Sequence, residues 1–230
     1  MRELSHLFIL FPLLTLMNFG IIQKNNTVNA QTVRGQKIGH ANNIVSMTAT
    51  NGYLFSVTRD NKLWLRPAEP SPINWQHIGH ANDVTALAGV GSNLYVTTRD
   101  NKLWVRSTNR GDENWTHIGH ANNITAMAGV NGKLFATTSD NKLWVRSANR
   151  RDEPWTRIGH ANNIVDMGCY NNGLVAVDTN GTIWVRPPVS KEVNWEKVGT
   201  ARNTVGIAAL RGDVFFVKGS DNSLNMFDLQ

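Results

Sequence analysis

A period of 40 residues runs through the chain and constrains its fold more than any other feature. Glycines recur at this spacing, and all eight tryptophans fall at two positions of the repeat. The recurring glycines are Gly39, Gly79, Gly119, Gly159 and Gly199. The first tryptophans of the units are Trp64, Trp104, Trp144 and Trp184, and the second are Trp75, Trp115, Trp155 and Trp195. Five copies of one unit predict a repeat architecture, in which each unit packs against its neighbours.

Within one unit, the sequence predicts four short strands and no helix. Asn131-Gly132 predicts a type I′ hairpin turn, Asp140-Asn141 predicts a second tight turn, and the segment from Gly119 to Asn123 is expected to be a loop. The strands expected in the third unit are Trp115–Ile118, Ile124–Val130, Lys133–Thr138 and Lys142–Arg146. A four-stranded unit of this length is typical of a propeller blade. We therefore expect an all-β, five-bladed β-propeller over residues 31–230.

The two ends of the chain are expected to complete the fifth blade together. The fifth unit stops after a strand at Leu224–Phe227, whereas residues 33–38 align with the outer-strand segment that begins at Trp115. Pairing of these two segments would close the ring and remove an exposed strand edge. The alternative architecture is a linear solenoid, which needs polar caps at its ends. The fifth unit lacks an outer strand, and residues 33–38 supply one at the other end of the chain. This complementarity argues against a solenoid.

Residues 1–30 differ from the repeats and have the features of a secretion signal. An apolar stretch of about 16 residues, from Leu7 to Ile22, precedes a polar segment that ends at Ala30. This stretch contains Pro12 and is short for a membrane span. We predict cleavage near Ala30 and a secreted chain, extracellular or periplasmic, with no membrane span. The alternative is an N-terminal anchor that is not cleaved.

Charge, cysteine and histidine content narrow the possible functions. The formal net charge is +6, and the basic residues are spread evenly rather than clustered, so we expect no nucleic-acid partner. Cys169 is the only cysteine, so a secreted fold must be held together by packing rather than by disulfides. The loop histidines occur once per blade, too far apart to share an ion. We therefore expect no metal and no other cofactor.

One face of the predicted propeller, here called the upper face, combines two kinds of loop. These are the Gly-His-Ala-Asn-Asn loops that enter the inner strands and the Asp-Asn-Lys turns. Loops on a rigid scaffold often carry binding function. Imidazoles and amides can form hydrogen bonds with sugar hydroxyls, and indole faces can pack against the apolar side of a sugar. The candidate ligand-binding residues are His40, Asn42, His80, Asn82, His120, Asn122, His160, Asn162, Trp75, Trp115, Trp155 and Trp195.

Several repeated residues also have a structural interpretation. The Gly-His pairs and the second tryptophans suit either role, whereas the Asp-Asn pairs are typical of turn chemistry. Trp64 and its equivalents lie mid-strand beside leucines or other aliphatic residues and are expected to belong to the core. Arg66 and its equivalents follow the first tryptophan by two residues, on the same side of the strand, and are expected to stack on an indole face; contact with an anionic group of a ligand is the alternative.

The fifth unit lacks the residues that the other four share. Its loop reads Gly199-Thr-Ala-Arg-Asn203, so it has no histidine, and Arg202 replaces the first asparagine. Asn225 and Gly35 occupy the two tryptophan positions. We therefore expect four working sites and one degenerate site.

The repeat resembles that of a known class of lectins. Its motifs are Trp-x-x-Ile-Gly-His-Ala-Asn-Asn-Ile, Ala-Met-Ala-x-x-Asn-Gly-Lys-Leu-Phe and Thr-x-Asp-Asn-Lys-Leu-Trp-Val-Arg. They are similar to the repeats of lectin β-propellers of the tectonin and tachylectin-2 type, over residues 33–230. The resemblance implies glycan or glycoconjugate partners bound between neighbouring blades, innate-defence or adhesive roles, and no catalysis; one weak site per blade would gain affinity by multivalency. Tachylectin-2-type units are longer and their loops do not match residue by residue, so only the location of the sites is carried over.

Two other function classes remain as alternatives. Gly119-His120 and Leu143-Trp144 echo the layout of WD repeats, although Val145 follows Trp144 where those repeats have aspartate. This similarity suggests an extracellular protein-interaction scaffold. A glycoside hydrolase would need at least two carboxylates in the central channel. Asp166 is the only acidic residue inside an expected inner strand, so we expect no enzyme.

Overall fold

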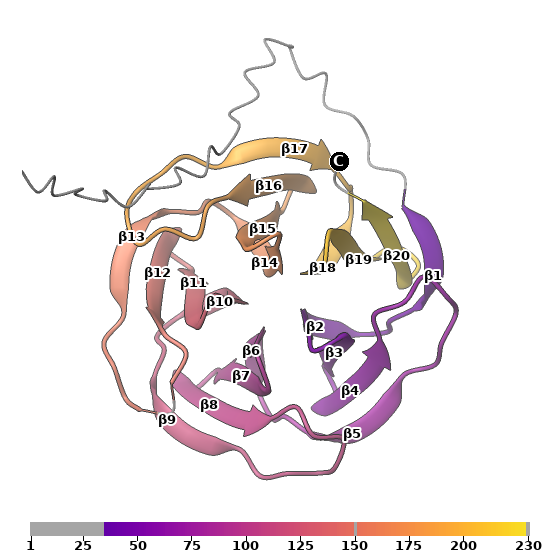
Figure 1. Ribbon diagram of the computed structural model, residues 1–230, viewed down its shortest axis with the longest axis horizontal. Helices are drawn as coiled ribbons and strands as arrows, with labels where there is room; N and C mark the ends of the chain where they lie inside the picture. Colours follow the sequence, from indigo (N-terminus) through magenta and orange to yellow (C-terminus); the bar gives the residue numbers. More distant parts are fainter. Residues whose placement is uncertain (1–34, 150, 229–230) are drawn as a thin grey trace, which may run out of the picture.

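The computed structural model describes residues 35–149 and 151–228 and shows a five-bladed β-propeller (Figure 1). The blades are five four-stranded antiparallel sheets arranged around a central axis, as the 40-residue repeat predicted. No helix occurs in this part of the chain, and accordingly none that could cross a membrane. The predicted signal peptide lies outside the described residues and stays a prediction.

The strands occupy the same position in every blade, counted outward from the axis. The innermost strands are β2 (Ile44–Thr50), β6 (Val84–Val90), β10 (Ile124–Val130), β14 (Ile164–Tyr170) and β18 (Thr204–Leu210). The second strands are β3 (Tyr53–Thr58), β7 (Asn93–Thr98), β11 (Lys133–Thr138), β15 (Gly173–Asp178) and β19 (Asp213–Lys218). The third strands are β4 (Lys62–Pro67), β8 (Lys102–Ser107), β12 (Lys142–Ser147), β16 (Thr182–Arg186) and β20 (Ser223–Asp228). The outermost strands are β5 (Gln76–His80), β9 (Thr116–His120), β13 (Thr156–His160), β17 (Glu196–Thr200) and β1 (Gln36–His40).

The turn chemistry of the sequence determines where most of these strands begin and end. Asn131 and Gly132 have φ values of 48° and 72°, as a type I′ turn between β10 and β11 requires. Asn141, in the turn between β11 and β12, has a φ of 63°, which asparagine tolerates better than most residues. Because both turns are fixed locally, β10 and β11 have the bounds that the sequence predicted.

The outer strands extend further than predicted. The Gly-His pair belongs to the strand rather than to the loop, so β9 runs from Thr116 to His120. Gly119 adopts a φ of 133° at a register shift between β8 and β9, where the ladder is interrupted by a β-bulge. Glycine can take this conformation without strain, so the strand continues through the bulge to His120.

Strand exchange between the chain ends closes the ring. Strand β1 pairs antiparallel with β20, with Gln36 opposite Met226 and His40 opposite Ser223. In Figure 1, β1 in indigo lies at the outer edge of the blade that β18, β19 and β20 form in yellow. This confirms the predicted closure and covers the outer edge of β20.

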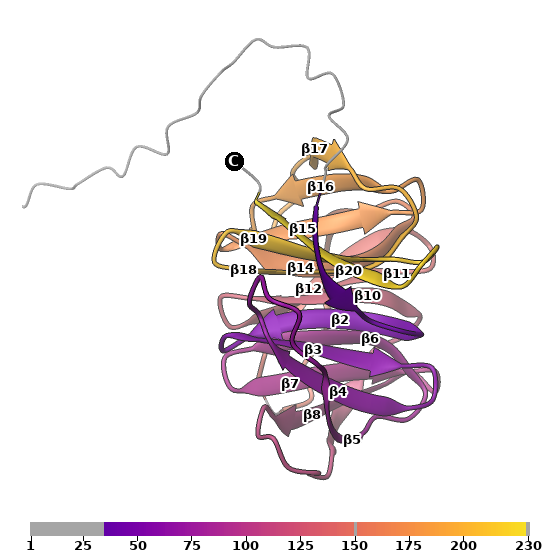
Figure 2. The same ribbon diagram turned by 90° about the vertical axis from the view of Figure 1, so that its right-hand side faces the viewer.

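The hydrophobic core lies between the blades rather than within one sheet. One cluster joins Phe55 and Leu65 of the first blade to Leu87 and Leu94 of the second, and similar clusters occur at the other junctions. Figure 2 shows the sheets from the side, stacked face to face around the ring. This packing fixes the distance and angle between neighbouring blades, which the sites at their junctions depend on.

Asp166 connects three blades near the axis. Its carboxylate accepts hydrogen bonds from Ser46 Oγ at 3.0 Å, from the backbone N–H of Met47 at 3.2 Å and from that of Ile207 at 3.0 Å. Ser46 Oγ in turn accepts the N–H of Leu87 at 3.1 Å, which extends the network to a further blade. Asp166 is 1% exposed, and through these hydrogen bonds it links the inner strands of three blades.

Candidate functional site

Four pockets recur at equivalent junctions between blades on the upper face. Each is lined by a histidine, the asparagine two residues later, and one tryptophan of each kind. We call them sites 1 to 4, in the order of their histidines, and their cavity volumes are about 360, 630, 670 and 380 Å³. Their shared residues are His40, Asn42, Trp64 and Trp75 in site 1; His80, Asn82, Trp104 and Trp115 in site 2; His120, Asn122, Trp144 and Trp155 in site 3; and His160, Asn162, Trp184 and Trp195 in site 4. The structure thus brings all the predicted site residues together in four sets.

Each site joins the end of one blade to the face of the next. In site 1, His40 ends strand β1 of the fifth blade, whereas Trp75 directly precedes β5 of the first blade. The Trp75 indole donates a hydrogen bond to the backbone oxygen of His40 at 2.8 Å. The same bond recurs at 2.7, 3.0 and 3.0 Å in sites 2, 3 and 4. Since this bond uses the indole N–H, the second tryptophan can offer a ligand its apolar ring.

An arginine supports each second tryptophan from one side. The guanidinium carbon of Arg66 lies 5.9 Å from the ring centroid of Trp75, and the equivalent distances are 5.7, 5.7 and 5.5 Å. Arg66 is buried and also donates to the backbone oxygen of Ser71 at 2.6 Å, which ties down the loop before the tryptophan. The predicted stacking of this arginine is confirmed, and the indole it covers is that of the second tryptophan.

The prediction that the first tryptophans belong to the core holds only in part, since all four are half-buried and only Trp104 packs against a core cluster. Trp64 and its three equivalents are half-buried and line the pockets. Leu63 and Leu65 point to the opposite side of strand β4 and are buried, as the alternation of a strand requires. The blades diverge with distance from the axis (Figure 1), so a side chain on the third strand can lack cover from the neighbouring blade.

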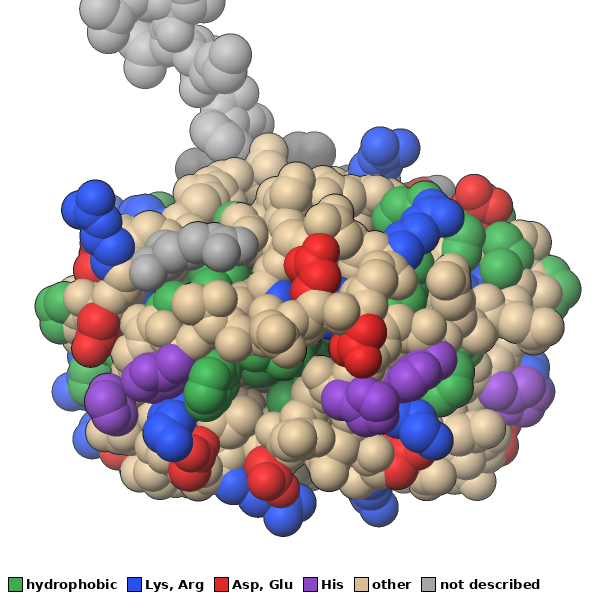
Figure 3. Space-filling model, turned by 90° about the horizontal axis from the view of Figure 1, so that it is seen from below, with side chains coloured by type: hydrophobic (Ala, Val, Ile, Leu, Met, Phe, Trp, Pro, Cys, Tyr) green, Lys and Arg blue, Asp and Glu red, His purple; other side chains and the backbone are tan. Residues whose placement is uncertain are grey.

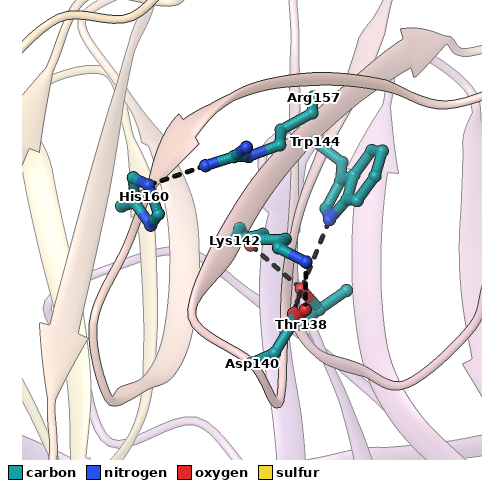
Figure 4. A network of polar contacts seen from close by, with 6 residues as sticks. All are labelled: Thr138, Asp140, Lys142, Trp144, Arg157 and His160. Carbon is teal, nitrogen blue, oxygen red and sulfur yellow. Dashed lines mark hydrogen bonds and ion pairs between the residues drawn. The ribbon is translucent and has the colours of Figure 1, made fainter.

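A chain of polar contacts holds the first tryptophan in place, as Figure 4 shows for site 3. Trp144 Nε1 donates to Thr138 Oγ1 at 3.3 Å, and the Thr138 hydroxyl donates to Asp140 Oδ1 at 2.5 Å. Lys142 Nζ pairs with Asp140 Oδ2 at 2.6 Å. Hydrogen bonds from Lys142 and Thr138 lower the pKa of Asp140 to about 2, so it carries a negative charge at neutral pH. Sites 1 and 2 have the same chain.

Site 4 uses a carboxylate in place of this threonine. Asp178 Oδ2 accepts the indole N–H of Trp184 at 3.0 Å. Its other oxygen accepts the backbone N–H groups of Asn180 at 2.9 Å and Thr182 at 2.8 Å. The first tryptophan is therefore fixed in all four sites, although by two different chemistries.

Sequence reasoning did not select these tryptophans, threonines and aspartates as site residues. Their own 40-residue recurrence was the available signal, because Thr58, Thr98 and Thr138 are as regularly spaced as the histidines. The Asp-Asn pairs do serve as turns, as predicted: Asn61 Oδ1 accepts the N–H of Asp83 in the loop of the next blade, at 3.0 Å. The aspartate of each pair in sites 1 to 3 also lines the pocket.

A histidine or arginine side chain of the outermost strand lies between neighbouring sites. His77 lies 5.2 Å from Trp64 and 5.2 Å from His80, measured between ring centroids, and so stands between sites 1 and 2. Arg157 takes the same place between sites 3 and 4, where its guanidinium contacts His160 Nε2 at 2.7 Å (Figure 4). Figure 3 shows histidine side chains in groups on one side of the molecule, beside side chains of Lys, Arg, Asp and Glu. The described residues contain no group of three or more side chains that could hold a metal ion.

The fifth junction differs from the other four, as the sequence predicted. Asn225 lies between Lys37 and Phe216 in the ladder, at the position of the first tryptophan. Its amide is buried and donates to Ser223 O at 3.0 Å and to Ser223 Oγ at 2.9 Å. Gly35 lies so close to the Phe216 ring that an added Cβ would be 2.7 Å from it. This junction therefore lacks both indole surfaces.

Comparisons with known proteins support the fold. A glutaminyl cyclase from Myxococcus xanthus has a TM-score of 0.60 and 18% sequence identity, over 87% of this chain and 97% of that one. A chain of a nidogen–laminin complex has a TM-score of 0.53 and 11% identity, over 81% of this chain and 76% of that one. No protein-family model and no curated protein sequence matches. Because the first of these proteins is an enzyme, the fold by itself does not decide between binding and catalysis.

Proposed function

We propose that this protein is a secreted, non-catalytic carbohydrate-binding protein with four glycan sites on one face. The observation that carries the proposal is the recurrence of one chemical set in sites 1 to 4. Each set combines two half-buried indoles with exposed imidazole and amide groups and with an ionised carboxylate in at least site 3. A sugar ring presents a matching combination of an apolar face and a rim of hydroxyls.

The geometry supports a shallow site for one or two sugar units rather than a deep pocket. The histidines and the first asparagines are exposed, whereas the tryptophans are held by hydrogen bonds and by the supporting arginines. Rigid aromatic surfaces lose little conformational entropy when a ligand binds. We expect weak affinity at each site and a large gain from multivalency when the glycans are clustered.

The position of Asp166 favours the binding proposal over the hydrolase alternative. Its carboxylate is fully buried, and its three hydrogen-bond donors are a serine hydroxyl and two backbone N–H groups. A general acid or nucleophile must reach the substrate. The pockets of the upper face, by contrast, contain the residues that can contact a ligand directly.

A glycan array followed by isothermal titration calorimetry tests the proposal. We expect binding to at least one glycan class and a stoichiometry of four sites per chain. Asn122→Ala should remove one of the four sites, and Arg202→Ala at the fifth junction serves as the matched control that leaves all four intact. Binding to no glycan, together with capture of a protein ligand on the same face, would replace the proposal with a protein-interaction scaffold. Hydrolysis of a chromogenic glycoside that is lost in Asp166→Asn would contradict both.

A further inference from the structure

Site 1 contains a buried hydroxyl group without a hydrogen-bond partner. Ser56 lines this site and is 2% exposed. Its Oγ has no hydrogen-bond partner among residues 35–149 and 151–228. Buried hydroxyls in proteins nearly always have a partner, because an unpaired one costs free energy. Because this oxygen is itself almost inaccessible, its partner must be a group that reaches the bottom of the pocket, and a hydroxyl group of a ligand can supply it.

The strand register places Ser56 beside the first tryptophan of site 1. Ser56 on β3 lies directly opposite Trp64 on β4, and side chains opposite one another project from the same face of a sheet. Thr58, two residues further along β3, projects from this face too and accepts the Trp64 indole N–H at 3.1 Å. The hydroxyl of Thr58 is engaged with Asp60 at 2.6 Å, which leaves Ser56 with the free hydroxyl.

The other three sites have an apolar side chain at the same place. Val96 lies opposite Trp104, Ala136 opposite Trp144, and Ala176 opposite Trp184. All three are buried. At this strand position, then, site 1 carries a hydroxyl group and sites 2 to 4 carry only carbon, and of the three apolar side chains Val96 lines its pocket.

We propose that Ser56 determines the specificity of site 1 for a sugar that carries a hydroxyl group on the carbon nearest the Trp64 edge. Sites 2 to 4 would accept a deoxy carbon or a methyl group there. This inference rests on the proposed function. Its physical basis is that a site built to bond a ligand hydroxyl rejects the analogue that lacks it, whereas an apolar wall discriminates weakly between the two. The protein would then display one hydroxyl-selective site and three more permissive ones.

The first tryptophans allow each site to be observed separately. Trp64, Trp104, Trp144 and Trp184 each give one indole N–H signal in a ¹⁵N-correlated NMR spectrum of the labelled protein. The probes are the methyl glycosides of glucose, galactose and mannose together with their monodeoxy derivatives. For the sugar that binds, we expect removal of one particular hydroxyl to weaken binding at site 1 by about tenfold or more. The same removal should change binding at sites 2 to 4 by less than about threefold.

Two reciprocal variants test the role of Ser56. Ser56→Ala should abolish this discrimination at site 1, and Ala136→Ser should introduce it at site 3. Thermal unfolding of Ser56→Ala should occur at or above the wild-type temperature, because the removed hydroxyl has no partner in the unliganded protein. Signals of Trp104 and Trp184 are the internal controls and should respond to sugar as in the wild type.

The outcomes separate this inference from the proposed function. If site 1 binds sugar and Ser56→Ala keeps the full discrimination, the specificity role of Ser56 is overturned while the lectin function stands. The same conclusion follows if all four sites discriminate equally in the wild type. If no indole signal moves with any of the probes, the proposed function itself fails, and the role of Ser56 fails with it.

Discussion

At the scale of single residues, the hydrogen bonds that orient an indole ring matter as much for a binding site as the ring itself. In site 3, Thr138 accepts the Trp144 indole N–H and donates to Asp140. Without Thr138, the half-buried indole N–H loses its acceptor, and the ring is less well oriented for a ligand. The exposed carboxylate would keep its ion pair with Lys142.

We therefore expect Thr138→Val to lower the free energy of unfolding by about 1 kcal/mol. It should also weaken sugar binding at site 3 several-fold and leave the other sites unchanged. Thr138→Ser retains the hydroxyl and should restore both properties. Urea denaturation and the NMR signal of Trp144 measure the two effects. Wild-type stability and binding in the valine variant, together with a loss in the serine variant, would show that the methyl group, not the hydroxyl, supports the indole.

Asp166 makes stability depend on pH. Burial raises the pKa of its carboxyl from 3.8 to about 7, against hydrogen bonds that favour the ionised form. Between about pH 4 and pH 7 the folded protein keeps a proton that the unfolded chain releases. The free energy of unfolding should therefore fall as pH rises through this window, by roughly 4 kcal/mol in total.

Asp166→Asn tests this dependence. The amide has nearly the same shape and cannot ionise, so the variant should lose most of the pH slope between pH 4 and pH 7. Urea denaturation at several pH values gives the slope directly. Asp140 provides the contrast, because its lowered pKa predicts loss of its contribution below about pH 4 instead. An Asp166→Asn protein with the wild-type slope would show that another group carries the dependence.

At the scale of elements, strand β1 has the least conventional position. It is the outer strand of the last blade, and it comes from the opposite end of the chain. Ile38 attaches it to the core, since this side chain is buried in the cluster that includes Leu224. Its counterpart Ile118 on β9 is equally buried, but β9 follows its own blade directly in sequence.

We expect Ile38→Ala and Ile118→Ala each to lower the free energy of unfolding by about 2–4 kcal/mol. Only Ile38→Ala should also speed hydrogen exchange along β20, because β1 can separate from β20 while the rest of the ring stays folded. Exchange measured by mass spectrometry on peptides from residues 219–228 distinguishes the two variants. Wild-type protection of β20 in Ile38→Ala would contradict a separable closing strand.

At the scale of the whole molecule, four similar sites on one face should give strong binding only to clustered glycans. On a densely coated surface, the apparent affinity should exceed that for a single soluble glycan by a factor of about 10²–10⁴. The Asn→Ala substitution of the first loop asparagine, introduced in one site after another, should reduce surface binding in steps. Arg202→Ala is the control and should change nothing. Surface plasmon resonance at several glycan densities measures the effect, and equal affinity at all densities would argue against multivalent binding.

The 40-residue period and the local turn residues are enough to determine the architecture from the sequence alone. Asn131-Gly132 and Asp140-Asn141 fix hairpins through backbone preferences that depend on a few neighbouring residues, so their strands could be predicted closely. The closure of the ring could be predicted from the same repeat. The fifth unit contains three of the four expected strands, and residues 33–38 match the missing fourth one.

Only the tertiary structure decided how residues from neighbouring blades combine. His40 and Trp75 are 35 residues apart and belong to different blades, yet one hydrogen bond joins them. The exposure of Trp64 depends on how far the fifth blade lies from strand β4, and the unpaired state of Ser56 depends on every group around it. A sequence pattern reports the preferences of a segment, whereas burial and hydrogen bonding are properties of the space between segments. The repeat therefore predicted the blades, and the packing of the blades made the sites.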